Sequence, residues 1–439
     1  MSRILIAAAQ KQGGGSVVVS GFVYNKRTHK GLVFIDLRDI SGVLQLVFVE
    51  AENKNAYDAV VDLNLESVIE VSGELKEKPT KKNIDPAVIL VKDYELNVSA
   101  VKVISAAAEQ LPIPVLQKAD NEADLEARFD WRFLDLRRPE HALIFKVWTE
   151  FEKGLRKYCN EASYTQIYTP TLMNTASETG ADVFAVKYFD RTAYLAQSPQ
   201  FYKQMAMAAG LEKVFMTGTV FRAEKSFTTR HVTEFTGWDF EISFITEYEE
   251  IMAEEEKMIV SGFTELKNNL DLEIDIPTMP FPRLTMKEAK AKLVANNVTI
   301  DGDEDLNPEE ERSICEIIKK ETGHDFIFIT EYPASIRAFY HMRKENEPTL
   351  TKSFDLLYRG VEITTGAIRE HRLEILEKQA VEKGMNLEEL KDYLNFFRYG
   401  CPNHGGAGIG MARIIMKILN LGNVKEAVFL PRDVKRLTP

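Results

Sequence analysis

The sequence predicts an α+β protein whose N-terminal domain is a small closed β-barrel. Between residues 16 and 100, five short segments rich in β-branched and aromatic residues alternate with turn signals, which fits an OB-fold. Further along, two apolar runs, Val214–Phe221 and Glu234–Phe244, enclose a polar loop and predict two antiparallel strands. The chain has 439 residues, 45% of them hydrophobic, so we expect two or three domains with a large core.

The composition excludes several classes of protein. Its three cysteines, Cys159, Cys315 and Cys401, are odd in number and far apart, which argues against a disulfide framework. The apolar run Ile4–Ala9 is too short for a signal peptide or a membrane span, so we expect a cytoplasmic protein with no membrane partner. The net charge of −12 argues against a nonspecific nucleic-acid coat, but a local basic patch could still bind RNA.

The strand pair within Val214–Phe244 carries residues suited to a nucleotide and a small zwitterion. Alternate residues of a strand share a face, which groups an aromatic ring, a glycine and two carboxylates. These residues are Phe235, Gly237, Asp239 and Glu241, with Arg222 and Glu224 at the end of the first strand and Arg230 and His231 in the loop. The alternative is an ordinary hairpin with a solvated charged tip.

The run FRAEKSFTTRH…EFTGWDFE resembles motif 2 of the class II aminoacyl-tRNA synthetases, most closely that of the aspartyl-tRNA synthetases. This resemblance implies an antiparallel sheet flanked by helices rather than a Rossmann sheet. It implies that Arg222 binds the α-phosphate of ATP, that Phe235 stacks on adenine and that Asp239 takes the substrate ammonium. The far phosphates would be bound by Arg230, His231 and Arg413, with Glu224 also in the ATP site.

The predicted barrel carries a candidate nucleic-acid face. The run Arg27…Phe34-x-Asp36-x-Arg38…Gly42-x-x-Gln45 resembles the anticodon-binding barrel of aspartyl-tRNA synthetases. In that family the matching residues contact anticodon bases, so the resemblance assigns this role to Arg27, Phe34 and Gln45. An OB barrel alone is a weak signal, because such barrels also bind sugars, proteins and DNA.

We expect the barrel domain to span residues 1–103, a hinge 104–128, and the catalytic domain 129–439. WRFLDLRRP, followed by an amphipathic helix ending near Asn160 and a strand to Pro170, resembles motif 1, which forms the dimer in class II synthetases. The resemblance therefore implies a homodimer. A helix that only packs on the core would have the same pattern.

Residues 174–204 carry the expected amino-acid site. The run NTASETGADVF predicts a mobile loop, and YLAQSPQFYKQ predicts a strand, a turn and the start of a helix. The family resemblance implies that Lys203 receives the substrate's side-chain carboxylate, with Gln200 beside it and Glu178 in a closing loop. Thr179 stands where the family usually has glycine.

Residues 275–350 are predicted to form a helical insertion. The acidic run DGDEDLNPEEE is not an EF-hand loop, because Leu306 and Arg312 occupy positions that need glycine and glutamate. We expect Asn307 to cap a helix that begins with Pro308. Cys401 and His404 have no second pair nearby, so no zinc site is predicted.

The segment FDLLYRGVEITTGAIR is expected to complete the site. If Arg359-Gly360 is a two-residue turn, Leu357 pairs with Glu362 and Asp355 lies diagonally on the same face, a fit for Mg²⁺ bridging phosphates. Two solvent-facing acids on an edge hairpin are the alternative. The resemblance assigns metal binding to Asp355, Glu362 and Thr365, and aspartate binding to Arg369 and Thr365.

The C-terminal run HGGAGIGMAR resembles motif 3, whose arginine, here Arg413, binds the γ-phosphate of ATP. Gly410 would let the backbone approach the nucleotide. Ala412 replaces the glutamate that the family often has before this arginine.

Together these motifs predict an enzyme that joins L-aspartate to tRNA(Asp) with ATP and Mg²⁺, and they leave open whether tRNA(Asn) is a second acceptor. Asparaginyl-tRNA synthesis and a tRNA-independent enzyme that adenylates aspartate for amidation are the enzymatic alternatives. A catalytically idle tRNA-binding or regulatory module is the third.

Overall fold

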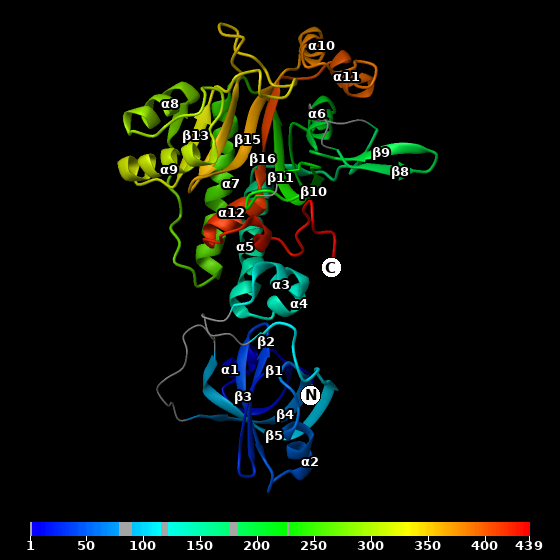
Figure 1. Ribbon diagram of the computed structural model, residues 1–439, viewed down its shortest axis with the longest axis vertical. Coiled ribbons are helices and arrows are strands. Elements are labelled where there is room, and N and C mark those ends of the chain that lie inside the picture. The colour runs from blue at the N-terminus through cyan, green and yellow to red at the C-terminus, as the bar shows by residue number, and fades with distance from the viewer. Residues whose placement is uncertain (1, 79–89, 116–121, 175–182, 226–227) are drawn as a thin grey trace. The chain divides into compact units, whose positions relative to one another are not determined.

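The computed structural model describes residues 2–78, 90–115, 122–174, 183–225 and 228–439. The chain divides into two compact units, Met1–Ala142 and Leu143–Pro439 (Figure 1). The predicted domain limits at residues 103 and 128 stay predictions. Among the helices of the described residues, none has both the length and the apolar character that crossing a membrane requires.

Unit 1 contains the predicted five-stranded barrel, which is closed in the order β1-β2-β3-β5-β4. Its strands are β1 (Gly15–His29), β2 (Leu32–Asp39), β3 (Gly42–Val49), β4 (Val68–Glu77) and β5 (Leu90–Ser105), with the helices α1 (Ile6–Gln12) and α2 (Lys54–Val61) beside them. Alternate residues such as Val33, Ile35 and Leu37 on β2 are fully buried. The period-2 pattern therefore builds the barrel core, as the sequence predicted.

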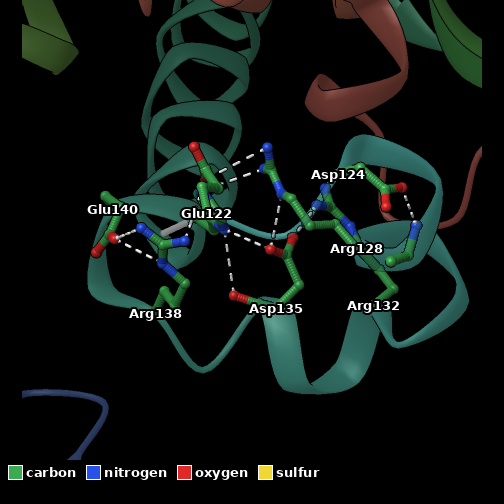
Figure 2. A network of polar contacts seen from close by, with 9 residues as sticks. Glu122, Asp124, Arg128, Arg132, Asp135, Arg138 and Glu140 are labelled. Carbon is green, nitrogen blue, oxygen red and sulfur yellow. Dashed lines mark hydrogen bonds and ion pairs between the residues drawn. The ribbon is translucent and has the colours of Figure 1, made fainter. Parts of the chain in front are cut away.

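Two short helices, α3 (Leu125–Asp130) and α4 (Arg132–Asp135), complete unit 1 and hold a buried charge cluster (Figure 2). We call Arg128, Arg132, Asp135 and His141 the clamp cluster. Asp135 Oδ1 lies 3.0 Å from Arg128 Nε and 2.8 Å from His141 Nδ1, and its Oδ2 lies 2.6 Å from Arg132 Nη1. Burial alone would raise the pKa of Asp135, but the bond to His141 and the two guanidinium groups lower it to about 2.

Unit 2 is built on an eight-stranded sheet in the order β12-β13-β14-β15-β16-β11-β10-β6. The strands are β6 (Thr165–Gln166), β10 (Lys213–Phe221), β11 (Glu234–Ser243), β12 (Arg283–Thr285), β13 (Phe326–Thr330), β14 (Ser353–Tyr358), β15 (Val361–Arg369) and β16 (His404–Gly410). The strands from β13 to β10 pair antiparallel, as expected, but the end strands β12 and β6 pair in parallel, so the sheet is mixed. The strand expected to reach Pro170 is only the two-residue β6.

Helices flank this sheet (Figure 1). They are α5 (Pro139–Glu161), which begins in unit 1, then α6 (Gln200–Ala208), α7 (Tyr248–Asn269), α8 (Met286–Ala295), α9 (Pro308–Thr322) and α12 (Met411–Ile418), followed by the 3₁₀ helix Val424–Ala427. The helices α10 (Leu373–Glu382) and α11 (Lys391–Arg398) pack with α6 in a separate core cluster. Val147 and Phe151 of α5, Ile259 of α7 and Ile414 of α12 share one core with sheet residues such as Phe240. The strands β7 (Leu172–Met173), β9 (Arg191–Leu195) and β8 (Ala185–Tyr188) form a separate small sheet, and β8 and β9 extend away from the main sheet (Figure 1).

The segment predicted as a helical insertion contains both helices and strands. β12 and β13 join the main sheet, and α8 and α9 lie side by side against it (Figure 1). Asn307 caps α9 as predicted: its side chain accepts from the backbone N–H of Glu309 and Glu310, while the Glu310 carboxylate accepts from the Asn307 N–H at 2.8 Å. Pro308 occupies the first turn, where its missing N–H costs nothing.

Candidate active site

A cavity of about 600 Å³ in unit 2 is lined by β10, β11, β15, β16, α6 and α12 and by the loops beside them. It gathers most of the site residues that the sequence predicted. Those that line it are Gln200, Lys203, Arg222, Glu224, Arg230, His231, Phe235, Asp239, Glu362, Thr365, Arg369, Gly410 and Arg413. Glu178 and Thr179 lie outside the described residues.

The β10–β11 pair supplies one wall with the alternation that the sequence predicted. Phe235, Gly237 and Asp239 line the cavity, and the Arg222 guanidinium lies 5.3 Å from the centre of the Phe235 ring. Gly237 and Gly408 make room for the Asp239 carboxylate. A Cβ at Gly237 would lie 3.0 Å from one carboxylate oxygen, and a Cβ at Gly408 would lie 2.9 Å from the other. The wall thus presents a flat ring at one end and a carboxylate at the other.

Four buried charges form the deep end of the cavity, and we call Lys203, Asp239, Glu241 and Arg369 the floor cluster. Lys203 Nζ lies 2.9 Å from Asp239 Oδ1 and 3.3 Å from Glu241 Oε2. Arg369 Nε donates to Glu241 Oε1 at 3.0 Å, and its Nη2 donates to the Gly406 carbonyl at 2.9 Å. Gln200 Nε2 also donates to Glu241 Oε1, at 3.3 Å.

The floor cluster differs in one respect from the predicted site. From the sequence we expected two cations, Lys203 and Arg369, to contact the substrate. Glu241 was placed on the same strand face as Asp239 but was given no role. Glu241 is fully buried, and burial would raise its pKa, but Arg369 and Lys203 hold that pKa below its ordinary value. The negative charge of Glu241 therefore pairs with both Lys203 and Arg369 and fixes their positions.

A second layer of polar side chains supports the floor cluster, and sequence reasoning did not find it. His404 is fully buried with Nδ1 at 2.8 Å from the Pro402 carbonyl, so Nδ1 carries the proton and Nε2 accepts from Gln204 Nε2 at 3.1 Å. Tyr393 donates to Gln204 Oε1 at 3.0 Å. Burial lowers the pKa of His404 to about 4, so the imidazole is neutral at pH 7.

The β14–β15 hairpin places the predicted metal residues. Arg359 and Gly360 have φ of 46° and 79° and form the expected two-residue turn, with Leu357 opposite Glu362. A register shift after Leu356 then puts Thr365 opposite Asp355. Thr365 Oγ1 donates to Glu362 Oε1 at 3.1 Å, so the hydroxyl and the carboxylate meet.

Asp355 is more enclosed than the sequence predicted. Among the described residues, Glu362 and Thr365 line the cavity but Asp355 does not, and its carboxylate pairs with Arg337 Nη2 at 2.7 Å. The Arg337 guanidinium also lies 3.8 Å from the centre of the Tyr332 ring. Sequence reasoning missed Arg337, which lies in the predicted insertion and contributes a cation where only acids were expected.

The oxygen donors of this hairpin still fit a hard divalent cation. Asp355 Oδ1 is buried with no hydrogen-bond partner in the described part of the chain, and Glu362 and Thr365 offer further oxygens. No group of three or more His, Cys, Asp or Glu suited to a metal occurs among the described residues. A cation here would therefore take its remaining ligands from water or from a substrate, as Mg²⁺ commonly does.

Cationic side chains surround the opposite end of the cavity. Arg413 Nη1 donates to the Glu362 carbonyl at 2.9 Å and lies 3.4 Å from Glu362 Oε2. Arg230 forms an ion pair with Glu311 of α9. His231 lies in the same wall, where burial and then the charge of Arg413 lower its pKa. The two guanidinium groups suit the phosphates of a nucleotide, and His231, which its lowered pKa keeps uncharged at pH 7, can add a hydrogen bond.

In unit 1, the three predicted anticodon residues lie together on adjacent strands. Arg27 is opposite Phe34 across β1 and β2, and its guanidinium lies 5.9 Å from the centre of the Phe34 ring. Arg27 Nη2 and Lys78 Nζ both donate to Gln45 Oε1, at 3.4 Å and 2.5 Å. The barrel thus presents an aromatic ring among donors, the arrangement used to bind single-stranded bases.

Comparison with known proteins finds a family match for most of the chain. Residues 124–434 match the family model of tRNA synthetases class II (D, K and N), and residues 17–104 match that of the OB-fold nucleic acid binding domain. The chain is 40% identical to the aspartate–tRNA(Asp/Asn) ligase of Aeropyrum pernix, covering 99% of this chain and 98% of that one. It is also 40% identical to the aspartate–tRNA(Asp) ligase of Picrophilus torridus, covering 96% and 97%.

Solved structures agree. Asparaginyl-tRNA synthetase from Pyrococcus horikoshii, complexed with asparaginyl-adenylate, superposes with a TM-score of 0.88 at 30% identity over all of both chains. Aspartyl tRNA synthetase from Entamoeba histolytica gives 0.85 at 32% identity, covering 97% of this chain and 90% of that one. The chain therefore belongs to the class II tRNA synthetases and, within them, to the aspartate–tRNA ligase family.

Proposed function

We propose that this protein activates L-aspartate with ATP to form aspartyl-adenylate and then transfers aspartate to the 3′-terminal ribose of tRNA(Asp), with AMP as the leaving group. The observation that carries the proposal is a single cavity with Lys203 and Arg369 at its deep end and Arg222, Arg230 and Arg413 around its other walls. An amino acid with an acidic side chain fits the first pair, and a triphosphate fits the second group.

The chemistry needs positioning and charge neutralisation rather than a general base. An α-carboxylate oxygen of aspartate attacks the α-phosphorus, the new P–O bond forms, and pyrophosphate leaves with the electron pair of the old bond. Arg222 stabilises the charge that grows on the α-phosphate, while Arg413, Arg230 and His231 hold the far phosphates. Phe235 stacks on adenine, with Glu224 and the Gly410 backbone beside it.

The floor cluster selects the amino acid. Lys203 and Arg369 receive the side-chain carboxylate, with Gln200 and Thr365 completing the pocket, and Asp239 takes the ammonium. Asparagine would present an amide nitrogen, itself a donor, to one of two cations. This argument favours aspartate even though asparaginyl-tRNA synthetases share the fold.

We assign Mg²⁺ as the divalent cation, held by Asp355, Glu362 and Thr365. When bound, it would supply positive charge that neutralises the phosphates of ATP. The hard oxygen donors of the hairpin support this assignment.

The proposal extends to the partners. Arg27, Phe34 and Gln45 would contact anticodon bases, and the relatives named for tRNA(Asp) and for tRNA(Asp/Asn) are both compatible with this face. The region of α5 would form a homodimer, supported by the resemblance of WRFLDLRRP to motif 1. Three free cysteines fit a reducing cytoplasm.

Aspartate-dependent exchange of pyrophosphate into ATP tests the first step, and charging of tRNA(Asp) and tRNA(Asn) transcripts tests the second. We expect exchange with aspartate but not with asparagine, and charging of tRNA(Asp). Arg222→Ala and Arg413→Ala should each lower the exchange rate by about 10²-fold, the loss of one preorganised charge donor.

Each alternative has its own result. Exchange without charging of either tRNA would indicate an enzyme that adenylates aspartate for another purpose. The absence of exchange with either amino acid would indicate a tRNA-binding module. Near-normal exchange in both arginine variants would overturn the phosphate assignments.

A further inference from the structure

An acidic side chain that does not belong to the predicted site contacts two residues of the proposed ATP site. Glu311, in the first turn of α9, is 9% exposed and forms an ion pair with Arg230 through Oε2. The same Oε2 accepts a hydrogen bond from the backbone N–H of Glu362 at 3.2 Å. One carboxylate oxygen therefore links the loop after β10 to the start of β15.

The start of α9 explains why this glutamate differs from its neighbours. Successive helical residues point about 100° apart, so three consecutive acids have three different surroundings. Glu309 is exposed and pairs with Arg312, whereas Glu310 is buried and pairs with Lys290 at 3.1 Å. Glu311 is the one directed at Arg230. The cap at Asn307 fixes where the helix starts, and with it the direction of this carboxylate.

Arg230 and Glu311 affect each other's charge. Burial raises the pKa of Glu311 to about 7, and the charge of Arg230 is the largest cause that lowers it. After burial, Arg230 is the largest cause that lowers the pKa of Lys417, and Arg413 and Arg230 both lower that of His231. The backbone beside Arg230 is held separately, because the Thr229 carbonyl accepts from the Val424 N–H at 2.9 Å. The long side chain would still be free to turn away from its cationic neighbours without Glu311.

We propose that Glu311 is a positioning residue for ATP, holding the Arg230 guanidinium at the cavity wall and tying it to the backbone of Glu362. It prepares the phosphate end of the cavity before ATP arrives, so binding does not have to order this arginine. Glu311 acts through Arg230 and does not itself contact aspartate. The inference rests on the proposed ATP site.

Steady-state exchange kinetics on Glu311→Ala, Glu311→Gln, Arg230→Ala and the double variant Arg230→Ala/Glu311→Ala test this role. We expect Glu311→Ala to raise KM for ATP about tenfold, the scale of one charged hydrogen bond, with KM for aspartate unchanged. Glu311→Gln keeps an oxygen that accepts from both N–H groups and should recover part of the loss. Glu309→Ala, an exposed acid in the same turn, is the matched control and should leave KM for ATP unchanged.

The double variant separates positioning from a general structural role. If Glu311 acts through Arg230, removing both should cost no more than removing Arg230 alone. Losses that multiply, an equal rise in KM for aspartate, or an unchanged or lower KM for ATP in Glu311→Ala would overturn the proposal. If Glu311→Ala does not fold, Glu311→Gln in the Arg230→Ala background carries the same comparison.

Equilibrium dialysis with labelled ATP, without an amino acid, makes the result independent of the overall reaction. Weaker ATP binding in Glu311→Ala supports the proposal even if the wild-type protein shows no aspartate-dependent exchange, a result that would contradict only the proposed function. Unchanged ATP binding in the variant contradicts the role of Glu311 whether or not exchange occurs.

Discussion

The clamp cluster in unit 1 and the floor cluster in unit 2 both bury arginine or lysine beside carboxylates, but they are assembled differently. The clamp cluster comes entirely from residues 128–141, on α3, on α4 and at the start of α5, and its members converge on Asp135 (Figure 2). The floor cluster takes Lys203 from α6, Asp239 and Glu241 from β11, and Arg369 from β15.

The two clusters also differ in what their charges face. In the clamp cluster the carboxylate of Asp135 is enclosed by two guanidinium groups and an imidazole, so its charge is used within the protein. In the floor cluster, Lys203, Asp239 and Arg369 line a cavity while Glu241 holds both cations in place. The comparison indicates that a buried ion cluster serves binding when its balanced charges still line an open volume. It serves stability when its charges enclose one another.

The largest expected effect comes from breaking the floor cluster. Lys203→Leu should lower kcat/KM for aspartate on the order of 10³-fold, because both a substrate contact and a partner of Glu241 are lost. It should also narrow the preference for aspartate over asparagine, which we expect to be on the order of 10⁴-fold in the wild type. Competitive pyrophosphate exchange with both amino acids measures the ratio.

Lys290→Leu is the matched control for this change. Lys290 is equally a buried lysine paired with a glutamate, but it contacts Glu310 rather than the cavity. It should lower the free energy of unfolding without altering the ratio between the two amino acids. A wild-type preference for asparagine, or an unchanged ratio in Lys203→Leu, would contradict the assignment of the floor cluster.

Breaking the clamp cluster should affect stability instead of selectivity. Asp135→Asn leaves the buried Arg128 and Arg132 without their shared counter-charge, and we expect the free energy of unfolding to fall by about 3 kcal/mol. Urea denaturation of the full chain measures it, with the exposed Asp130→Asn expected to change stability by less than about 1 kcal/mol. If the folded Asp135→Asn protein lost its preference for aspartate, the division of roles between the clusters would be wrong.

A smaller effect is expected from a change on the proposed anticodon face of unit 1, which should affect tRNA charging but not the amino-acid site. Phe34→Ala removes one proposed base-stacking ring, worth about 1–3 kcal/mol in tRNA binding. Charging of tRNA(Asp) should weaken while aspartate-dependent exchange stays close to that of the wild type. An equal loss of both activities would show that Phe34 supports the fold rather than the anticodon contact.

Acid should weaken the folded state gradually and should reach the two clusters at different pH values. His404, beneath the floor cluster, has its pKa lowered to about 4 from an ordinary value of 6.5, so between these values the unfolded chain binds a proton that the folded chain does not. Its contribution therefore disfavours the folded state as the pH falls through this range, by at most about 1.4 kcal/mol per pH unit. Asp135, with a lowered pKa of about 2, contributes stability that is present above pH 3.8 and is lost only between there and pH 2.

The free energy of unfolding at several pH values from 6.5 to 4 tests the first part of this prediction. Comparing the wild type with His404→Gln isolates one group, because the other titrating residues are common to both proteins. The variant should show a shallower loss of stability with falling pH. Equal slopes would mean that His404 is not held neutral in the folded state.

Local patterns determined much of this protein. Alternating apolar residues specify the barrel strands and the β10–β11 pair, because the side chains of a strand project to opposite faces whatever lies around it. The Asn307 cap and the Arg359-Gly360 turn follow from hydrogen bonds and backbone angles within a few residues. The motifs that identify the family are also continuous stretches of sequence, so most of the predicted site residues that line the cavity could be found from them.

Only the tertiary structure decided which charges meet. The register shift after Leu356 puts Thr365 opposite Asp355, although regular pairing from the turn predicts Thr364 there. Arg337 on Asp355 and Glu311 on Arg230 come from a segment that sequence reasoning set aside as an accessory insertion. The periodicity of a sequence does not predict such ion pairs. An ion pair requires two side chains to reach the same buried position, and the packing of whole strands and helices determines the distance between them.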